Sequence, residues 1–159
     1  LKIKNLIFNK IMLLNKTLKM DFNIKNPKFF MAGINPHAGE NGLIGKEEIY
    51  INDILFNLKE NNIAIEGPYS ADSILSKKNI QKADAFIFNY HDQALIPFKL
   101  LDNFSGINYT GGLSIIRISP VHGTAYDLVR TSNANNNSLI NCFKYLKIIF
   151  NNRKKIDNS

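Results

Sequence analysis

The chain has 159 residues, of which 45% are hydrophobic and 21% charged, with one cysteine and no tryptophan. This composition fits one globular domain or part of a larger one, and it excludes disordered, collagen-like and disulfide-rich chains. The lone Cys142 cannot form an intramolecular disulfide and is interpreted as a small core residue. Nothing in the cysteine usage implies an oxidising compartment, so we expect a cytoplasmic protein.

The net charge of +7 is compatible with a nucleic-acid partner, because lysine and arginine neutralise phosphates. Only three of the 20 basic residues are arginines, namely Arg117, Arg130 and Arg153. The lysines are scattered among many asparagines and isoleucines. We therefore interpret the charge as a solvated surface and expect no nucleic-acid partner.

Residues 1–20 predict an amphipathic helix with lysines on its polar face. Its apolar side chains recur at steps of three and four residues: Ile3, Leu6, Ile7, Ile11, Leu14 and Leu18. No apolar run is long enough to span a membrane, so we expect this helix to pack against the core and no membrane partner. A basic amphipathic helix also suits a membrane surface, and that alternative stays open. The Asn26-Pro27 break closes this first region, residues 1–27.

Residues 28–150 alternate between predicted strands, loops and helices, which indicates an α/β fold. The apolar run 28–34 is typical of a strand buried on both faces of a parallel sheet, and the glycine-rich loop 35–45 leads from it into a helix at 46–60. The later elements are a strand at 63–65, a turn at Gly67-Pro68, a helix N-cap at Asp72, strands at 85–88, 106–109 and 115–118, a helical start at 122–124, a final helix at 138–150 and a polar, frayed tail at 151–159.

All three histidines fall in predicted loops, and none falls in an apolar helical stripe. His37 and His91 each follow a predicted strand, at the carboxyl edge where parallel sheets bind ligands. Neutral imidazoles bind zinc-like ions, and a carboxylate such as Asp92 is nearby. Two histidines do not complete a metal site, so a role as ordinary loop residues that hydrogen-bond backbone stays open.

Other polar residues also fall beside predicted element ends. Asp72 and Asp92 are the carboxylates best placed for proton transfer, although Asp72 equally suits a helix cap. Lys99, Asn108 and Arg117 occupy successive elements, from which each could present a polar group to an anion or to an amide-bearing ligand. No dinucleotide fingerprint or phosphate loop of the usual type occurs.

Four segments together resemble the 4-hydroxythreonine-4-phosphate dehydrogenase family, the NAD-dependent enzymes of pyridoxal phosphate biosynthesis. The segments are AGINPHAGENGLIG at 32–45, EGPYSAD at 66–72, NYHDQ at 89–93 and HGTA at 122–125. The resemblance covers residues 28–150 and corresponds to the C-terminal half of the family. It implies a three-layer α/β/α domain of the isocitrate-dehydrogenase type, with a mostly parallel sheet, in truncated form.

The resemblance also implies a reaction. NAD takes a hydride from the hydroxyl-bearing carbon of 4-phosphohydroxy-L-threonine, and the resulting β-keto acid loses carbon dioxide to give 3-amino-2-oxopropyl phosphate. A divalent metal (zinc, magnesium, cobalt or manganese) would lower the pKa of the hydroxyl and polarise the ketone. The implied roles are metal binding by His37 and His91, substrate binding by Lys99, Asn108 and Arg117, proton transfer or ligand orientation by Asp72 and Asp92, and nucleotide contact by His122, Gly123 and Thr124.

The chain also departs from the family pattern. The family's third metal histidine and its substrate-contacting His-Thr pair belong to an N-terminal portion without a counterpart here, and residues 1–27 hold no histidine. Val121 stands where Asp is usual, and Arg130 where Gly is usual. We therefore expect a homodimer, or a chain completed by a separate N-terminal half. The alternative is a non-catalytic fragment that transfers no hydride.

Overall fold

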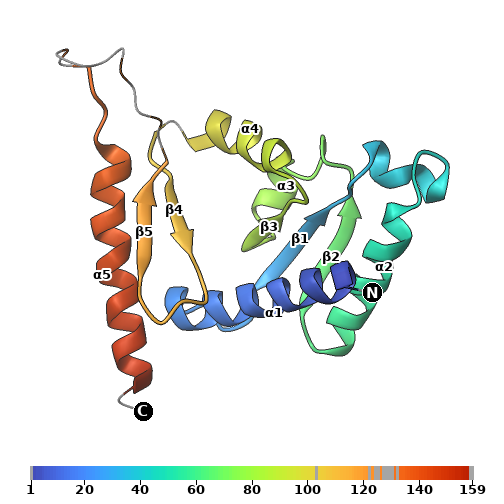
Figure 1. The fold of residues 1–159 in the computed structure, drawn as a ribbon, viewed down its shortest axis with the longest axis horizontal. Coiled ribbons are helices and arrows are strands. Elements are labelled where there is room, and N and C mark those ends of the chain that lie inside the picture. Colours follow the sequence, from blue (N-terminus) through green and yellow to red (C-terminus); the bar gives the residue numbers. More distant parts are fainter. Residues whose placement is uncertain are drawn as a thin grey trace.

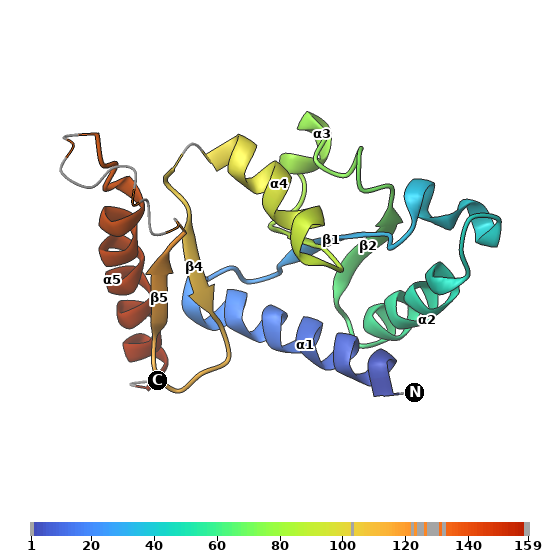
Figure 2. The same ribbon diagram turned by 45° about the horizontal axis from the view of Figure 1, so that its top comes forward.

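The computed structural model describes residues 2–102, 104–121, 123, 126, 131 and 133–157. Figures 1 and 2 show its ribbon in two orientations. Its elements in chain order are α1 (Lys2–Phe22), β1 (Lys28–Ala32), a short helical segment (Pro36–Gly42), α2 (Glu47–Glu60), β2 (Ala64–Tyr69), α3 (Lys77–Ile80), β3 (Ala85–Ile87), α4 (His91–Asp102), β4 (Ile107–Thr110), β5 (Arg117–Pro120) and α5 (Asn137–Asp157).

A parallel sheet of three strands has β1 at its centre, between β2 and β3. Phe29 of β1 is opposite Ile65 of β2 on one side and Ala85 of β3 on the other. Because the three strands run in the same direction, their carboxyl ends share one edge of the sheet. Every residue of β1 after Lys28 is buried, as expected for a strand covered on both faces. The predicted α/β fold with a parallel sheet is confirmed.

The two faces of β1 enter separate apolar clusters. Phe29 and Met31 pack against α1, α2 and β2, in a cluster that contains Ile11, Ile51, Ile54, Leu55, Leu58, Ile63 and Ile65. Phe30 and Ala32 face the other way and pack with Ile74 and with half-buried residues between 69 and 88. Helices α1 and α2 therefore cover one face of the sheet, while the segment that contains α3 covers the other, which gives three layers.

An antiparallel hairpin, β4–β5, lies beside α5 at the opposite end of the molecule from α2 (Figure 1). In the hairpin, Ile107 is opposite Pro120 and Thr110 is opposite Arg117. In both views, α1 extends from the hairpin and α5 at one end to α2 at the other (Figures 1 and 2). The first helix thus connects the two ends of the molecule.

The predicted first helix is confirmed, but its apolar face is buried only in part. Ile11 lies in the core, and Ile7, Leu14 and Leu18 pack against that core. Ile3, in contrast, is 72% exposed. Ile3 lines an open groove between the first turns of α1 and α2, which Lys4 bridges by its ion pair with Asp53. Among the described residues, no helix is both long enough and apolar enough to cross a membrane.

Two predictions in and after β2 are wrong. Gly67-Pro68 does not form a turn but continues β2, with a cis peptide bond and an irregular register against β1. Gly67 has φ +141°, a conformation that glycine adopts readily, so the strand continues through it. No helix begins at Asp72. The next helix starts at Lys77, and the Asp72 carboxylate instead accepts a hydrogen bond from Ser70 Oγ at 2.6 Å.

The last helix also differs from its prediction, because α5 continues to Asp157 and residues 151–157 are therefore helical. Its buried positions are Ser138, Cys142 and Ile149. Most of the predicted apolar face is exposed instead: Leu139, Ile140, Phe143, Leu146 and Phe150. Polar contacts hold α5 at both ends: Ser138 Oγ donates to the carbonyl of Gly106 near its start, and Asn152 and Arg153 bind Asp21 near its end.

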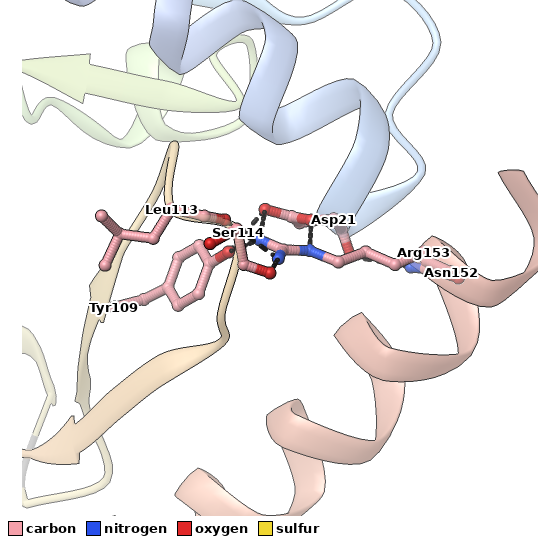
Figure 3. A network of polar contacts seen from close by, with 6 residues as sticks. All are labelled: Asp21, Tyr109, Leu113, Ser114, Asn152 and Arg153. Atoms are coloured by element: carbon pink, nitrogen blue, oxygen red, sulfur yellow. Dashed lines mark hydrogen bonds and ion pairs between the residues drawn. The ribbon is translucent and has the colours of Figure 1, made fainter. Parts of the chain in front are cut away.

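The contacts at the C-terminal end of α5 form the Asp21 network, which comprises Asp21, Tyr109, Asn152 and Arg153 with the carbonyls of Leu113 and Ser114 (Figure 3). The side chain of Asp21, at the end of α1, is 3% exposed. Arg153 Nε lies 2.6 Å from one of its oxygens, and Nη2 lies 3.1 Å from the other. The Tyr109 hydroxyl donates to Asp21 and accepts from Arg153 at 3.0 Å. The network therefore joins α1, β4 and α5 through one buried charge.

Candidate active site at the carboxyl edge of the sheet

The loop that leaves β1 carries His37 and has an unusual backbone. Residues 37–41 all have positive φ, from +43° at Glu40 to +76° at Gly39, so they form a left-handed turn. Left-handed backbone costs a non-glycine residue about 1 kcal/mol or more. The turn therefore depends on support from the rest of the structure.

Glu48, in the first turn of α2, supplies that support and is only 4% exposed. Its carboxylate accepts hydrogen bonds from the backbone N–H of Ile34 at 2.8 Å and of Asn35 at 2.7 Å, and from Asn35 Nδ2 at 2.7 Å. Burial opposes ionisation, but the hydrogen bonds to Asn35 and Ile34 outweigh it, so the pKa of Glu48 lies below its ordinary value.

The segment after β3 is tied to the end of β1 by two half-buried amide side chains. Asn89 Nδ2 donates to the carbonyl of Ala32 at 2.7 Å. Gln93 Nε2 donates to the carbonyl of Gly33 at 2.7 Å, while Gln93 Oε1 accepts the backbone N–H of Asn89 at 2.9 Å. The predicted strand ends therefore do converge. The sequence reasoning missed these two amides, although both lie in the NYHDQ motif.

A cleft of about 260 Å³ opens beside this junction and is lined by residues that include His37, Asp72, Tyr90 and Gln93. The hydrogen bond from Ser70 lowers the pKa of Asp72, and the nearby His37 lowers it further. The structure therefore brings His37 and Asp72 together from the loops after β1 and β2.

His91 and Asp92 lie at the start of α4, so His91 does not lie in a loop as predicted. His91 Nδ1 lies 2.8 Å from Asp92 Oδ1, and the two side chains are 77% and 75% exposed. Within the described ranges, no group of three or more histidine, cysteine, aspartate and glutamate residues is arranged to hold a metal ion. The imidazoles are suitable ligands, but the described residues do not complete a metal site.

The predicted substrate residues are spread along α4 and the hairpin. Lys99 Nζ donates to the carbonyl of Val121 at 3.1 Å, just beyond the end of β5. Arg117 begins β5 and donates from Nη1 to Thr110 Oγ1 at 2.9 Å. The hairpin ladder between them is about 10 Å long, and Asn108 is exposed along it. The structure does not bring these three side chains together.

The predicted nucleotide contacts fall mostly outside the described residues. His122 and Thr124 are not described, and Gly123 is described as exposed. Arg130, which departs from the family pattern, is likewise outside the described part. Nucleotide binding by residues 122–124 stays a prediction.

The fold and this cleft define an α/β protein with a candidate ligand site at the carboxyl edge of a parallel sheet. The sequence profile of the family described as pyridoxal phosphate biosynthetic protein PdxA matches residues 3–146. The chain therefore belongs to this family. The match begins within α1, whereas the resemblance drawn from the sequence motifs began only at residue 28.

Individual relatives agree with this assignment. The 4-hydroxythreonine-4-phosphate dehydrogenase of Bacteroides thetaiotaomicron is 39% identical over 153 residues, which are 96% of this chain and 42% of the relative. The Neisseria meningitidis enzyme of the same name is 46% identical over 129 residues, 80% of this chain and 39% of the relative. The chain thus spans about two fifths of the length of the curated relatives it matches.

Solved structures show the same similarity. The crystal structure of 4-hydroxythreonine-4-phosphate dehydrogenase from Klebsiella pneumoniae matches with a TM-score of 0.76 and 34% identity, over 90% of this chain and 44% of that one. A terephthalate 1,2-cis-dihydrodiol dehydrogenase from Burkholderia xenovorans matches with a TM-score of 0.68 and 28% identity, over 89% of this chain and 45% of that one.

Proposed function

We propose that this chain carries part of the active site of a dehydrogenase of pyridoxal phosphate biosynthesis. The substrate is 4-phosphohydroxy-L-threonine, NAD accepts the hydride, and the β-keto acid decarboxylates to 3-amino-2-oxopropyl phosphate. One observation carries the proposal. Asn89 and Gln93, of the NYHDQ segment at 89–93, bind the backbone at the end of β1, just before the NPHAGE segment at 35–40. The relatives that match 90% or more of this chain are named for this activity.

The environment of Asp72 favours one of its two proposed roles. A carboxyl group with a lowered pKa is a weaker base, and the ionised form of Asp72 is already stabilised chiefly by the hydrogen bond from Ser70. It therefore holds a proton poorly but accepts hydrogen bonds well. We assign Asp72 to orientation of the substrate hydroxyl or of the His37 imidazole. Proton transfer then falls to Asp92, next to His91.

Lys99 and Arg117 are assigned to the anionic groups of the substrate. Each donates a hydrogen bond to a neutral oxygen, a carbonyl for Lys99 and a hydroxyl for Arg117. Neutral partners do not neutralise the positive charges, so these side chains suit a phosphate and a carboxylate. Asn108, on the same hairpin, is assigned to a polar group of the substrate.

A divalent metal would polarise the oxygen at the reacting carbon of the substrate when bound. Imidazole suits zinc and cobalt better than magnesium, so His37 and His91 are assigned as two of its ligands. The described residues do not complete the ligand set. We therefore propose that the missing ligand comes from a second copy of the chain or from a separate N-terminal half.

The test measures NADH formation from 4-phosphohydroxy-L-threonine with a divalent metal added. The chain is assayed alone and mixed with the complementary N-terminal part of the Bacteroides relative. We expect turnover in the mixture, and its loss with His37→Ala and with His91→Ala but not with Lys82→Ala, an exposed site on another segment. A folded chain without turnover in either assay would contradict the proposal.

The second candidate function is a non-catalytic subunit or fragment. The observation that favours it is the absence of a three-ligand group among the residues that the structure places. This candidate predicts no NADH in any mixture, while zinc still shifts the imidazole resonances of His37 and His91.

A further inference from the structure

We propose that Glu48 and Gln93 are positioning residues, which fix the two histidine-bearing segments to the same short stretch of backbone. That stretch is 32–35, where β1 ends and the left-handed turn begins. This inference rests on the proposed function, because it concerns the placement of His37 and His91. Neither Glu48 nor Gln93 has been given a role in the reaction above.

Polar backbone atoms along this stretch bind partners from three other parts of the fold. The Gly33 N–H donates to the carbonyl of Tyr69 at the end of β2, at 2.8 Å. The carbonyls of Ala32 and Gly33 accept from Asn89 and Gln93, beyond β3. The N–H groups that follow donate to Glu48 of α2. Three elements therefore hold one short segment, which fixes the direction in which the chain leaves the sheet.

Glu48 governs the His37 side of the junction. Its carboxylate accepts three hydrogen bonds and also lies beneath the turn, since a Cβ on Gly39 would lie 2.6 Å from Glu48 Oε2. Both Glu48 oxygens face donors. An amide in its place would turn an NH₂ group toward Asn35 Nδ2, so that two donors would meet. The geometry thus requires a carboxylate, whose role is to hold the turn that contains His37.

Gln93 governs the His91 side, and both ends of its amide are used. The NH₂ group donates to β1 and the carbonyl oxygen accepts from Asn89. Glutamate would lose the donor and place a negative charge against the Gly33 carbonyl, while leucine would lose both bonds. His91 lies two residues earlier in the same turn of α4. Gln93 therefore sets the position of the His91 segment relative to β1.

The test uses NMR of isotope-labelled chain, first without metal. We expect Gln93→Leu to shift the His91 imidazole and Asn89 amide resonances, and Glu48→Gln to shift the His37 imidazole. The matched controls, Gln81→Leu and Glu60→Gln, change the same residue types at exposed sites away from the junction and should leave these resonances unchanged. Unaltered imidazole resonances in folded Gln93→Leu and Glu48→Gln would overturn the inference. If Gln93→Leu does not fold, Gln93→Glu provides the same readout.

Zinc alone is the second probe. In the wild-type chain one zinc ion should shift both imidazoles over the same concentration range. Either variant should weaken zinc binding about tenfold and separate the two responses, as is usual when a group that orients a ligand is removed. A wild-type chain in which zinc shifts neither imidazole would contradict the proposed metal ligands, whereas the metal-free spectra would still decide the positioning roles.

Discussion

Two glycines of the turn after β1 differ in what surrounds them, although both have positive φ. Gly39 has φ +76°, and a Cβ there would press on the buried Glu48 carboxylate. Gly42 has φ +94°, and a Cβ there would meet nothing within 4 Å. A substitution at Gly42 therefore adds backbone strain alone, while one at Gly39 also disturbs the hydrogen bonds of Glu48.

We expect Gly39→Ala to lower the free energy of unfolding by about 2 kcal/mol and Gly42→Ala by about 1 kcal/mol. Urea denaturation of the two variants beside the wild type measures both values. Equal losses of stability in the two variants would show that Glu48 moves away from a Cβ at position 39 without cost, and therefore does not support the turn.

Tyr109 makes the free energy of unfolding fall as the pH becomes alkaline. Burial and the adjacent Asp21 carboxylate raise its pKa to about 12, from 10.0 in an unperturbed tyrosine. Because the folded pKa is the higher one, this contribution is complete below about pH 10 and is lost as the pH rises toward about 12. Solvent screens part of the effect, so we expect a loss of about 1 kcal/mol.

The measurement is the free energy of unfolding at about pH 9 and about pH 11.5, for the wild type and for Tyr109→Phe. The wild type should lose more stability than the variant over this interval. The difference isolates Tyr109, because the pKa of Tyr69 is also raised to about 12 in both proteins. Equal losses in the two proteins would refute this origin of the pH dependence.

Helices α1 and α5 depend on each other through the Asp21 network. Arg153→Met would leave the Asp21 carboxylate buried at 3% exposure without its cation. Removal of one partner of a buried pair typically costs about 3 to 5 kcal/mol, whereas replacement of both costs far less. We therefore expect Arg153→Met to be more destabilising than the double variant Asp21→Asn with Arg153→Met.

A double-mutant cycle by chemical denaturation tests this coupling. The control is Lys154→Met, which removes an exposed cation from the adjacent position of α5. If the losses of the single variants simply add in the double variant, the two helices are not coupled through this pair.

At the same scale, local patterns predicted most elements but not how they end. The run 28–34 predicted β1 because burial on both faces selects a continuous apolar segment. The end of α5 was missed because Arg153 finds its partner 132 residues away, beyond any local pattern. Gly67-Pro68 was misassigned because these two residues usually mark turns, whereas here the neighbouring strand keeps them extended.

The candidate site also contains features that the sequence predicted and features that it did not. The positions of His37 and His91 beyond strand ends followed from the order of strands and loops. The contributions of Glu48 and Gln93 did not, because their partners are backbone atoms of a distant segment, which no local residue pattern identifies. Lys99 and Arg117 were grouped by their spacing, but the hairpin holds them at opposite ends of its ladder.

On the scale of the whole molecule, α5 presents an apolar stripe to solvent. Its members lie three and four residues apart: Leu139, Phe143, Leu146 and Phe150, with exposed fractions of 46%, 65%, 37% and 58%. A stripe with this spacing suits packing against another helix. The proposed homodimer or N-terminal half would cover such a surface.

We expect the chain alone to self-associate through this stripe, with a mass that rises with concentration in sedimentation equilibrium. Phe143→Lys should weaken association about tenfold, because it places a charge at the centre of the stripe. Asn137→Lys adds the same charge at the start of α5, off the stripe, and should leave the mass unchanged. A wild-type chain that stays monomeric at all concentrations would argue against a homodimer through α5.

The buried pair of Asp21 and Arg153 also bears on how the chain is made. A ribosome adds the cation 132 residues after the carboxylate, and at about 5 to 20 residues per second that interval lasts about 7 to 26 s. An unpaired charge resists burial, so the C-terminal end of α1 stays hydrated on the nascent chain while the parallel sheet assembles behind it. Burial of this end of α1 then waits for the segment that carries Arg153.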